Sequence, residues 1–188
     1  MDLRQKLHEQ VLVLRCQAGD REAFASLFKR YHVPLKYYLR RLLNSPEKAD
    51  DVLQTVWLKA LREIGRLRHS GAFRVWLYRL ARNEALQEIR RDRRWTEVEE
   101  SLSVAQPDGH EDEFTAEDAA RVHGALAEIS PAHSEVLVLR YLEELSYEEI
   151  ALVVGCELGT VRSRLHYAKR AMRRVLEGQN DGEQERIP

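Results

Sequence analysis

The sequence predicts an all-α protein with two small helical domains joined by an acidic linker, the second domain being a helix-turn-helix. Three observations lead to this prediction. Apolar residues recur at helical spacing along most of the chain, and strand-type alternation is weak. Nine acidic residues and no Lys or Arg lie between Thr96 and Asp118, a composition typical of a flexible linker. The stretch from Leu145 to Arg174 reads as two helices joined by a tight turn.

The length of 188 residues allows one or two small domains, each with a modest core. The charge and composition changes along the chain set the expected boundaries. The C-terminal tail is polar and is expected to be disordered. The expected segments are a first domain at 1–95, an acidic linker at 96–116, a second domain at 117–177 and a tail at 178–188.

The first domain is expected to hold four helices. Asp20 stands where the second begins, and Pro34 should kink or split that helix. Ser45-Pro46-Glu47 combines a capping serine, a first-turn proline and an early acid, which together start a third helix. A loop at 67–72 then precedes the fourth. The expected helices cover about 11–18, 20–42, 46–64 and 73–91.

The second domain is also expected to hold four helices. Ser130-Pro131 opens its second helix. Ser146 and Glu149 form a capping box at the start of its third. Gly155 can take the left-handed conformation that ends a helix, and Thr160 can cap the next one. The expected helices cover about 117–128, 131–142, 147–154 and 158–176.

The last of these helices is cationic. Six Lys or Arg residues and no acid lie between Leu158 and Leu176. Val161 and Leu165 are four residues apart and should be buried, which turns the opposite face outward. A cationic helix held by a compact partner is what a helix-turn-helix inserts into the major groove. A solvated basic helix in an ordinary bundle is disfavoured, because cap, turn glycine and cationic face occur in register.

Two other helices carry candidate surfaces. Six Arg residues lie between Arg79 and Arg94, and three aromatic residues come just before them, a combination that suits single-stranded nucleic acid. Taken alone, an ordinary core with surface arginines is the more economical interpretation of that helix. On the third helix, acids, a Gln, a Trp and two Leu lie off the buried stripe. Either that face is a docking surface for a protein, or its Trp is simply a partly buried side chain at the edge of the core.

Several classes of function are excluded by what the sequence lacks. The net charge of −1 implies no partner by itself. Cys16 and Cys156 form no metal-ligand pattern, and the seven His residues show no ligand spacing. Without a phosphate-binding loop or a nucleophile motif, we expect no enzyme activity, no cofactor and no metal. Without a signal peptide or an apolar run of about 20 residues, we expect a soluble cytoplasmic protein with no membrane partner.

Three motifs resemble the bacterial sigma factors of RNA polymerase, specifically the extracytoplasmic-function (ECF) group. They are ADDVLQTVW at 49–57, AFRVWLYRLARNEALQEIRR at 72–91 and LSYEEIALVVGCELGTVRSRL at 145–165. The resemblance implies a transcription initiation factor that binds core RNA polymerase, directs it to promoters and assists DNA melting. The alternative is a stand-alone helix-turn-helix regulator, which would leave residues 20–95 without a task.

The resemblance also implies which residues make each contact. Core polymerase would be bound by Asp51, Gln54 and Trp57. The minus-ten element would be read by Arg68, His69, Ser70, Phe73, Trp76, Arg79, Asn83, Arg90 and Arg91. The minus-thirty-five element would be read by Thr160, Arg162, Ser163, His166, Tyr167 and Arg170. The expected partners are the large subunits of core polymerase, promoter DNA and, as is frequent in the family, an anti-sigma factor.

Two features leave the reading of the promoter open. Many family members have a Gly-Asp pair in the minus-ten loop, where this chain has His69-Ser70-Gly71, so the preferred base is undetermined. The acidic linker adds a hypothesis of its own, since it could fold back on the basic helices of the free protein. Salt would screen such an attraction.

Overall fold

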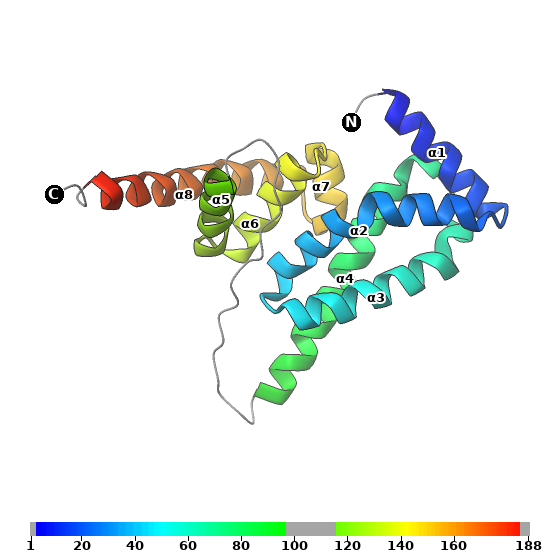
Figure 1. The fold of residues 1–188 in the computed structure, drawn as a ribbon, viewed down its shortest axis with the longest axis horizontal. Coiled ribbons are helices and arrows are strands. Elements are labelled where there is room, and N and C mark those ends of the chain that lie inside the picture. Colours follow the sequence, from blue (N-terminus) through cyan, green and yellow to red (C-terminus); the bar gives the residue numbers. More distant parts are fainter. Residues whose placement is uncertain (1–2, 97–115, 185–188) are drawn as a thin grey trace.

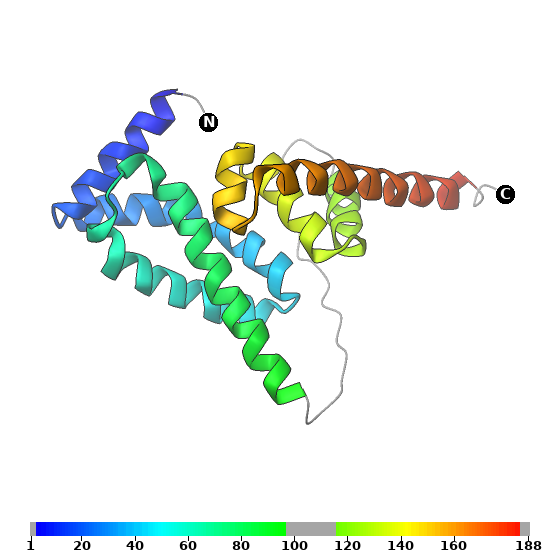
Figure 2. The ribbon, with the colours of Figure 1, turned by 180° about the vertical axis from the view of Figure 1, so that it is seen from behind.

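The computed structural model describes the backbone of residues 3–96 and 116–184. Almost all of the predicted linker lies outside these residues. The hypothesis that the linker folds back on the basic helices therefore concerns residues outside the described ones. Every regular element in the described residues is helical, which confirms the all-α prediction. The helices form two groups, α1–α4 and α5–α8, and these groups touch each other (Figures 1 and 2).

In the first group, α2 and α3 begin directly after the predicted capping residues Asp20 and Ser45. The Asp20 side chain accepts hydrogen bonds from the backbone N–H groups of Glu22 and Ala23, and the Ser45 hydroxyl accepts one from Lys48. Each bond satisfies a backbone donor that the first turn of a helix leaves without a partner. The elements are α1 (Leu3–Gln17), α2 (Arg21–Leu43), α3 (Pro46–Glu63), η1 (Ile64–Arg66), η2 (Ser70–Ala72) and α4 (Phe73–Thr96).

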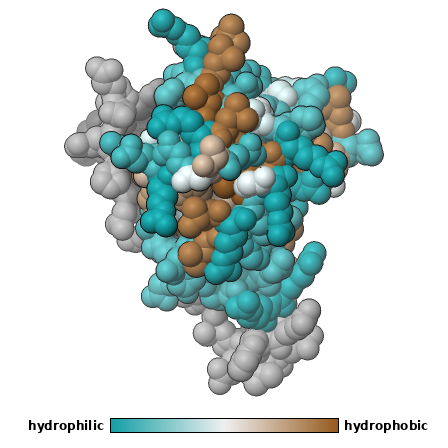
Figure 3. Space-filling model, turned by 90° about the vertical axis from the view of Figure 1, so that its right-hand side faces the viewer, coloured by the Kyte–Doolittle hydropathy of each residue, from teal (hydrophilic) through white to brown (hydrophobic). Residues whose placement is uncertain are grey.

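One of these helices takes the first of two predicted alternatives, and another begins earlier than predicted. Helix α2 continues through Pro34 as one element, so it is not split, and its axis bends part-way along (Figure 1). Helix α1 begins at Leu3 instead of near residue 11. The apolar side chains in the early turns of α1 form an exposed row. Their helical spacing therefore does not mark a face that packs against the core. Figure 3 views the side of the molecule where α1 lies and shows hydrophobic residues in a band. The row consists of Leu3, Leu7, Val11 and Leu14.

The second group follows its predicted starts closely. Ser146 and Glu149 exchange both bonds of a capping box, and Gly155 ends α7 with a φ of 69°. Helix α6 passes into a short π-helical segment, η3, before the turn. Helix α8 extends to Gln184, beyond its predicted end near residue 176. The elements are α5 (Ala116–Glu128), α6 (Pro131–Leu137), η3 (Val138–Leu142), α7 (Tyr147–Val154) and α8 (Leu158–Gln184).

The buried apolar side chains of the two groups belong to one continuous cluster. Leu27, Leu35 and Leu77 are fully buried among α1–α4, and Ile150 and Leu165 are almost fully buried among α5–α8. Burying such a side chain stabilises the fold by roughly 1.5–3 kcal/mol. Between the groups, α7 packs against α4 and α6 packs against α2. No helix in residues 3–96 or 116–184 is both long and apolar enough to cross a membrane.

One contact between the groups should depend on pH. The Tyr37 hydroxyl on α2 lies 2.6 Å from Nδ1 of His123 on α5. Burial, together with the nearby Arg41 guanidinium, lowers the pKa of His123 below its ordinary value of 6.5. The neutral imidazole is therefore the form that the folded protein favours. Its contribution to stability is complete above pH 6.5 and is lost as the pH falls through the lowered pKa.

We therefore expect the NMR titration of the His123 ring to have its midpoint below 6.5. In the Tyr37→Phe variant, which removes the hydroxyl partner and keeps the ring, the midpoint should change. The contact would be contradicted by a midpoint at 6.5 that the variant leaves unmoved.

Candidate docking groove and nucleic-acid interfaces

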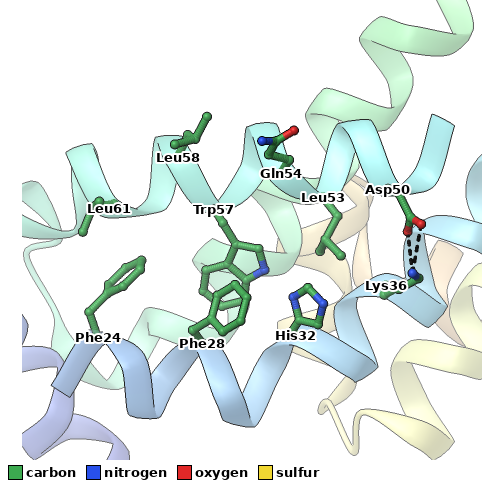
Figure 4. A pocket seen from close by; sticks show the side chains of 10 residues that line it. All are labelled: Phe24, Phe28, His32, Lys36, Asp50, Leu53, Gln54, Trp57, Leu58 and Leu61. Carbon is green, nitrogen blue, oxygen red and sulfur yellow. Dashed lines mark hydrogen bonds and ion pairs between the residues drawn. The ribbon is translucent and has the colours of Figure 1, made fainter. Parts of the chain in front are cut away.

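An apolar groove runs between α2 and α3 (Figure 4). The ring of Trp57 forms its floor, with centroids 4.8 Å from Phe28 and 5.9 Å from Phe24. Leu58 and Leu61 stand on the α3 side and are about half exposed, at 50% and 54%. Solvent-exposed leucines next to aromatic rings are the usual composition of a surface that a protein partner covers.

The predicted core-binding residues take different places around this groove. Gln54 lines it and is exposed, and Asp51 is exposed beside it on α3. Trp57 is only 6% exposed, so a partner would meet the edge of its ring at the floor of the groove. Trp57 thus belongs to the core, and the docking surface stays a prediction. Phe28 also lines the groove and is partly exposed, although it is not among the residues predicted to bind a partner.

The two ends of the groove differ in polarity. Lys36 of α2 and Asp50 of α3 form an ion pair of 2.8 Å across one end, where both side chains are partly exposed. Such a pair contributes about 0–1 kcal/mol to stability, so it marks a polar rim more than it holds the helices together. Towards Leu61 the groove is apolar.

The loop that precedes α4 is braced from α1. The Gln17 side chain donates hydrogen bonds to the backbone carbonyls of Ile64 and Leu67, at 3.0 and 2.8 Å. Farther along, Gly71 lies so close to α1 that a Cβ on it would come within 2.8 Å of Nε2 of Gln10. Two contacts to one helix therefore hold this loop in place. Of the predicted minus-ten residues here, Arg68 and His69 are exposed and Ser70 is half-buried.

Four of the predicted minus-ten residues share one face of α4. Trp76, Arg79, Asn83 and Arg90 are separated by three, four and seven residues, which is helical spacing. The three polar residues are exposed, and Trp76 is half-buried at the start of the face. Arg91 is exposed but lies to one side, paired with Glu88 at 3.1 Å.

Phe73 does not belong to that face. Its side chain is fully buried, and its ring lies 5.7 Å from the ring of Tyr31 and 5.8 Å from that of Trp76. A ring with no exposed surface cannot stack on a base in this conformation. The interleaving of aromatic residues with arginines predicted a nucleic-acid contact, but at this position the helical stripe of the core takes the aromatic side chain.

The acids of α4 are largely neutralised by α3. Lys59 pairs with Glu84 at 2.7 Å, and Lys48 pairs with Asp92 at 2.6 Å. Within residues 3–92, no acid forms an ion pair with Arg79 or Arg90. The positive field on this face of α4 is therefore not cancelled by the acids of its own helix, which favours the binding of phosphate groups.

The second candidate face for nucleic acid lies on α8. Val161 and Leu165 point into the core as predicted, and Ala168 continues that stripe. The predicted minus-thirty-five residues occupy the opposite face, where all are exposed except the half-buried Thr160. The rings of His166 and Tyr167 lie 5.4 Å apart on this face. No acid in the described part of the chain forms an ion pair with the cations of the first five turns of α8.

The residues that the structure describes hold no cluster of three or more His, Cys, Asp or Glu side chains that could bind a metal ion. Both cysteines are half-buried free thiols.

Comparison with known proteins places these surfaces in a family. Residues 27–96 match Sigma-70 region 2, and residues 119–172 match Sigma-70 region 4. The RNA polymerase sigma-H factor of Pseudomonas aeruginosa is 32% identical, over 90% of this chain and 94% of that protein. The ECF RNA polymerase sigma-E factor of Escherichia coli is 33% identical, over 90% of this chain and 95% of that protein.

Two solved structures share the fold. The sigma factor RpoE of Bartonella quintana, solved in complex with the anti-sigma factor NepR, has a TM-score of 0.72 and 23% identity, covering 82% of this chain and 96% of that one. CnrH, solved in complex with the cytosolic domain of CnrY, has a TM-score of 0.65 and 22% identity, covering 91% and 98%. The sequence relatives together with the two matched regions establish the conclusion: this chain belongs to the ECF sigma factors of RNA polymerase, which are transcription initiation factors and not enzymes.

Proposed function

We propose that the chain divides the work of a sigma factor among three surfaces. The α2–α3 groove binds core RNA polymerase, the face of α4 with its preceding loop binds the minus-ten element, and α8 reads the minus-thirty-five element. The observation that carries this assignment is the presence of an apolar groove and two separate cationic faces on one chain. A stand-alone regulator would use only α8, so the groove and the face of α4 would have no task.

At the groove, the exposed residues of α3 make the contacts with polymerase. Asp51 and Gln54 supply polar partners, while Leu58 and Leu61 supply the apolar area that a partner removes from water. Trp57 supports this surface from beneath and keeps the groove open between the two helices.

At the minus-ten element, the braced loop receives an unpaired base near Arg68, His69 and Ser70. Extruding a base from the duplex costs a few kcal/mol, which the protein must recover through stacking and hydrogen bonds. A loop already held by α1 spends less conformational entropy on binding than a free one. Trp76 offers a partly exposed ring for stacking, and the cations of α4 follow the strand.

At the minus-thirty-five element, Arg162 lies near the N-terminal end of α8, from which side chains reach base edges in the major groove. We expect Arg162→Ala to weaken promoter binding by about 1–3 kcal/mol, or roughly 5- to 150-fold, and to relax the preference at one base pair. Binding by polymerase with the variant, measured on a panel of promoters with single base changes, checks this. Arg174→Ala, an exposed cation about three turns farther on, is the control and should leave the preference unchanged.

If Arg162→Ala instead weakens binding to every promoter in the panel equally, Arg162 contacts phosphate and does not read a base. The slope of the logarithm of affinity against the logarithm of salt concentration should then decrease by about one, because one fewer counterion is released.

Transcription in vitro tests the whole assignment. Purified core polymerase and genomic DNA fragments are incubated with and without this chain, and new start sites are mapped. Start sites that share two upstream elements are the expected result. Failure of the chain to bind core polymerase, together with tight binding to duplex DNA on its own, would favour the stand-alone regulator.

The solved relatives also suggest a further partner. Both were solved with a bound protein, named as an anti-sigma factor in one case and as a cytosolic domain in the other. We infer that this chain works in the cytoplasm and that a protein inhibitor of this kind binds it there. Affinity purification of the chain from its own cells, with the bound protein identified by mass spectrometry, tests this inference.

A further inference from the structure

The outer face of α1 carries a row of exposed aliphatic side chains that the surfaces proposed for polymerase and DNA do not include. The row runs for about three turns, or roughly 16 Å along the helix. All of it precedes residue 27, where the match to Sigma-70 region 2 begins. Its members are 51% to 73% exposed and are Leu3, Leu7, Val11 and Leu14.

The opposite face of α1 holds the helix to the rest of the protein. Leu12 and Val13 are buried in the core cluster, and the buried Glu9 accepts a hydrogen bond from the Tyr31 hydroxyl. These contacts form whether the outer face is apolar or polar, so folding does not require aliphatic residues there. A contiguous exposed apolar surface of this kind marks a site of interaction.

The shape of the row fits a second helix. At 3.6 residues per turn, its four side chains fall within an arc of about 80°. Helices that lie against a core usually have an apolar stripe about 100° wide or wider, whereas a narrower stripe is typical of the seam between two paired helices. The spacings of four, four and three residues along the row are those at which side chains of one helix pack between those of another.

The charges beside the row select the kind of helix. Glu9 is the only acid among residues 3–17, and its carboxylate is buried. Lys6 lies beyond one edge of the row and Arg4 beyond the other, and both are exposed. The surface on both sides of the row is therefore cationic. A partner helix with Asp or Glu on its flanks would complement it, because charges beside an apolar seam set the choice of partner.

Two other occupants fit this surface less well. In a second copy of this chain, the same face would bring Arg4 and Lys6 towards like charges of the first copy, or towards Arg15 in an antiparallel pair, and these would repel. A lipid bilayer would gain too little. A single myristoyl chain gives only marginal, reversible membrane binding, and the row exposes less apolar surface than such a chain because parts of its four side chains are already covered.

We propose that the outer face of α1 is a docking site for a partner protein, which presents an amphipathic helix with an apolar seam and acidic flanks. The apolar row supplies the contact area, and the cations on either side select the partner by its charge. Binding at this face requires neither the α2–α3 groove nor the faces of α4 and α8.

Two synthetic peptides test the docking site on the full chain. Each has three heptads with Leu at the seam positions, and the flanking positions are all Glu in one peptide and all Lys in the other. Like charges keep each peptide from pairing with itself. Fluorescence anisotropy of the labelled peptides, titrated with the protein, measures binding. The Glu peptide should bind roughly tenfold or more tightly than the Lys peptide, and salt should reduce this difference.

Variants of α1 separate the role of the row from that of the charges. Leu7→Gln combined with Leu14→Gln removes apolar surface, keeps good helix formers and should weaken the Glu peptide roughly tenfold or more. Val33→Gln is the matched control, because Val33 is 70% exposed on α2, and it should bind as the unchanged protein does. Arg4→Glu combined with Lys6→Glu should reverse the preference in favour of the Lys peptide. Circular dichroism checks that each variant is folded.

Other results would overturn the docking site. Neither peptide would bind, both would bind equally well, or Leu7→Gln with Leu14→Gln would leave the binding unchanged in a folded chain. If the protein sediments with vesicles of phosphatidylcholine and phosphatidylserine and the same double variant does not, the row binds lipid instead. If analytical ultracentrifugation shows a dimer that the double variant dissociates, the row joins two copies of the chain.

Discussion

Replacing both Leu58 and Leu61 by Asp should reduce the affinity for core RNA polymerase by about a thousandfold. Both side chains are half exposed on the rim of the α2–α3 groove, so they contribute little to folding. At the centre of an interface each would contribute about 2 kcal/mol or more, and an Asp there must also lose its water. About 4 kcal/mol corresponds to the thousandfold loss.

Fluorescence anisotropy of the labelled chain titrated with core polymerase measures this effect, and circular dichroism checks that the helices persist. Val33→Asp is the matched control, because Val33 is 70% exposed on α2 and does not line the groove. The control should bind polymerase as the unchanged protein does. If the double variant also binds with full affinity, the groove is not where polymerase docks.

Phe73→Ala should destabilise the first helical group severely. The ring is fully buried against Tyr31 and Trp76, and removing such a ring costs about 3–5 kcal/mol. For a domain of this size the loss corresponds to a decrease in Tm of roughly 12–40 °C. Thermal unfolding followed by circular dichroism measures it. Phe73→Leu keeps most of the volume and should cost much less.

Comparing Phe73→Ala with Trp76→Ala separates an effect on folding from an effect on DNA binding. Trp76→Ala removes a half-buried ring, so it should lower Tm less than Phe73→Ala does and should reduce promoter opening by polymerase. A Phe73→Ala protein with unchanged Tm and a selective defect in promoter opening would contradict our placement of Phe73 and return it to the minus-ten surface.

Local signals predicted most of the helices because each signal acts within a few residues. Ser45, Ser146 and Gly155 stand at helix ends, where backbone groups lack partners or the chain must turn, and the structure places them there. The outward face of α8 followed from Val161 and Leu165 in the same way, since the burial of one face fixes the other.

Features that depend on distant residues could not be predicted. An Arg in an aromatic-rich helix has the same local pattern whether it faces DNA or a carboxylate, so nothing near Arg82 in the sequence pointed to Glu135. Phe28 and Phe73 both follow helical spacing, yet the packing of α3 leaves one partly exposed and buries the other. The first turns of α1 were missed because Leu3 and Leu7 do not face the core.

The bracing of the minus-ten loop by α1 also decides which fragment of the protein can be studied alone. The match to Sigma-70 region 2 begins at residue 27, whereas Gln10 and Gln17, which hold the loop, precede it. The buried carboxylate of Glu9, the hydrogen-bond partner of Tyr31, precedes it as well. A fragment cut at the edge of the family match would keep α3, α4 and most of α2 but would lose the helix that braces the loop proposed to bind the minus-ten element. Weak binding of promoter DNA by such a fragment would then reflect the cut and not the protein.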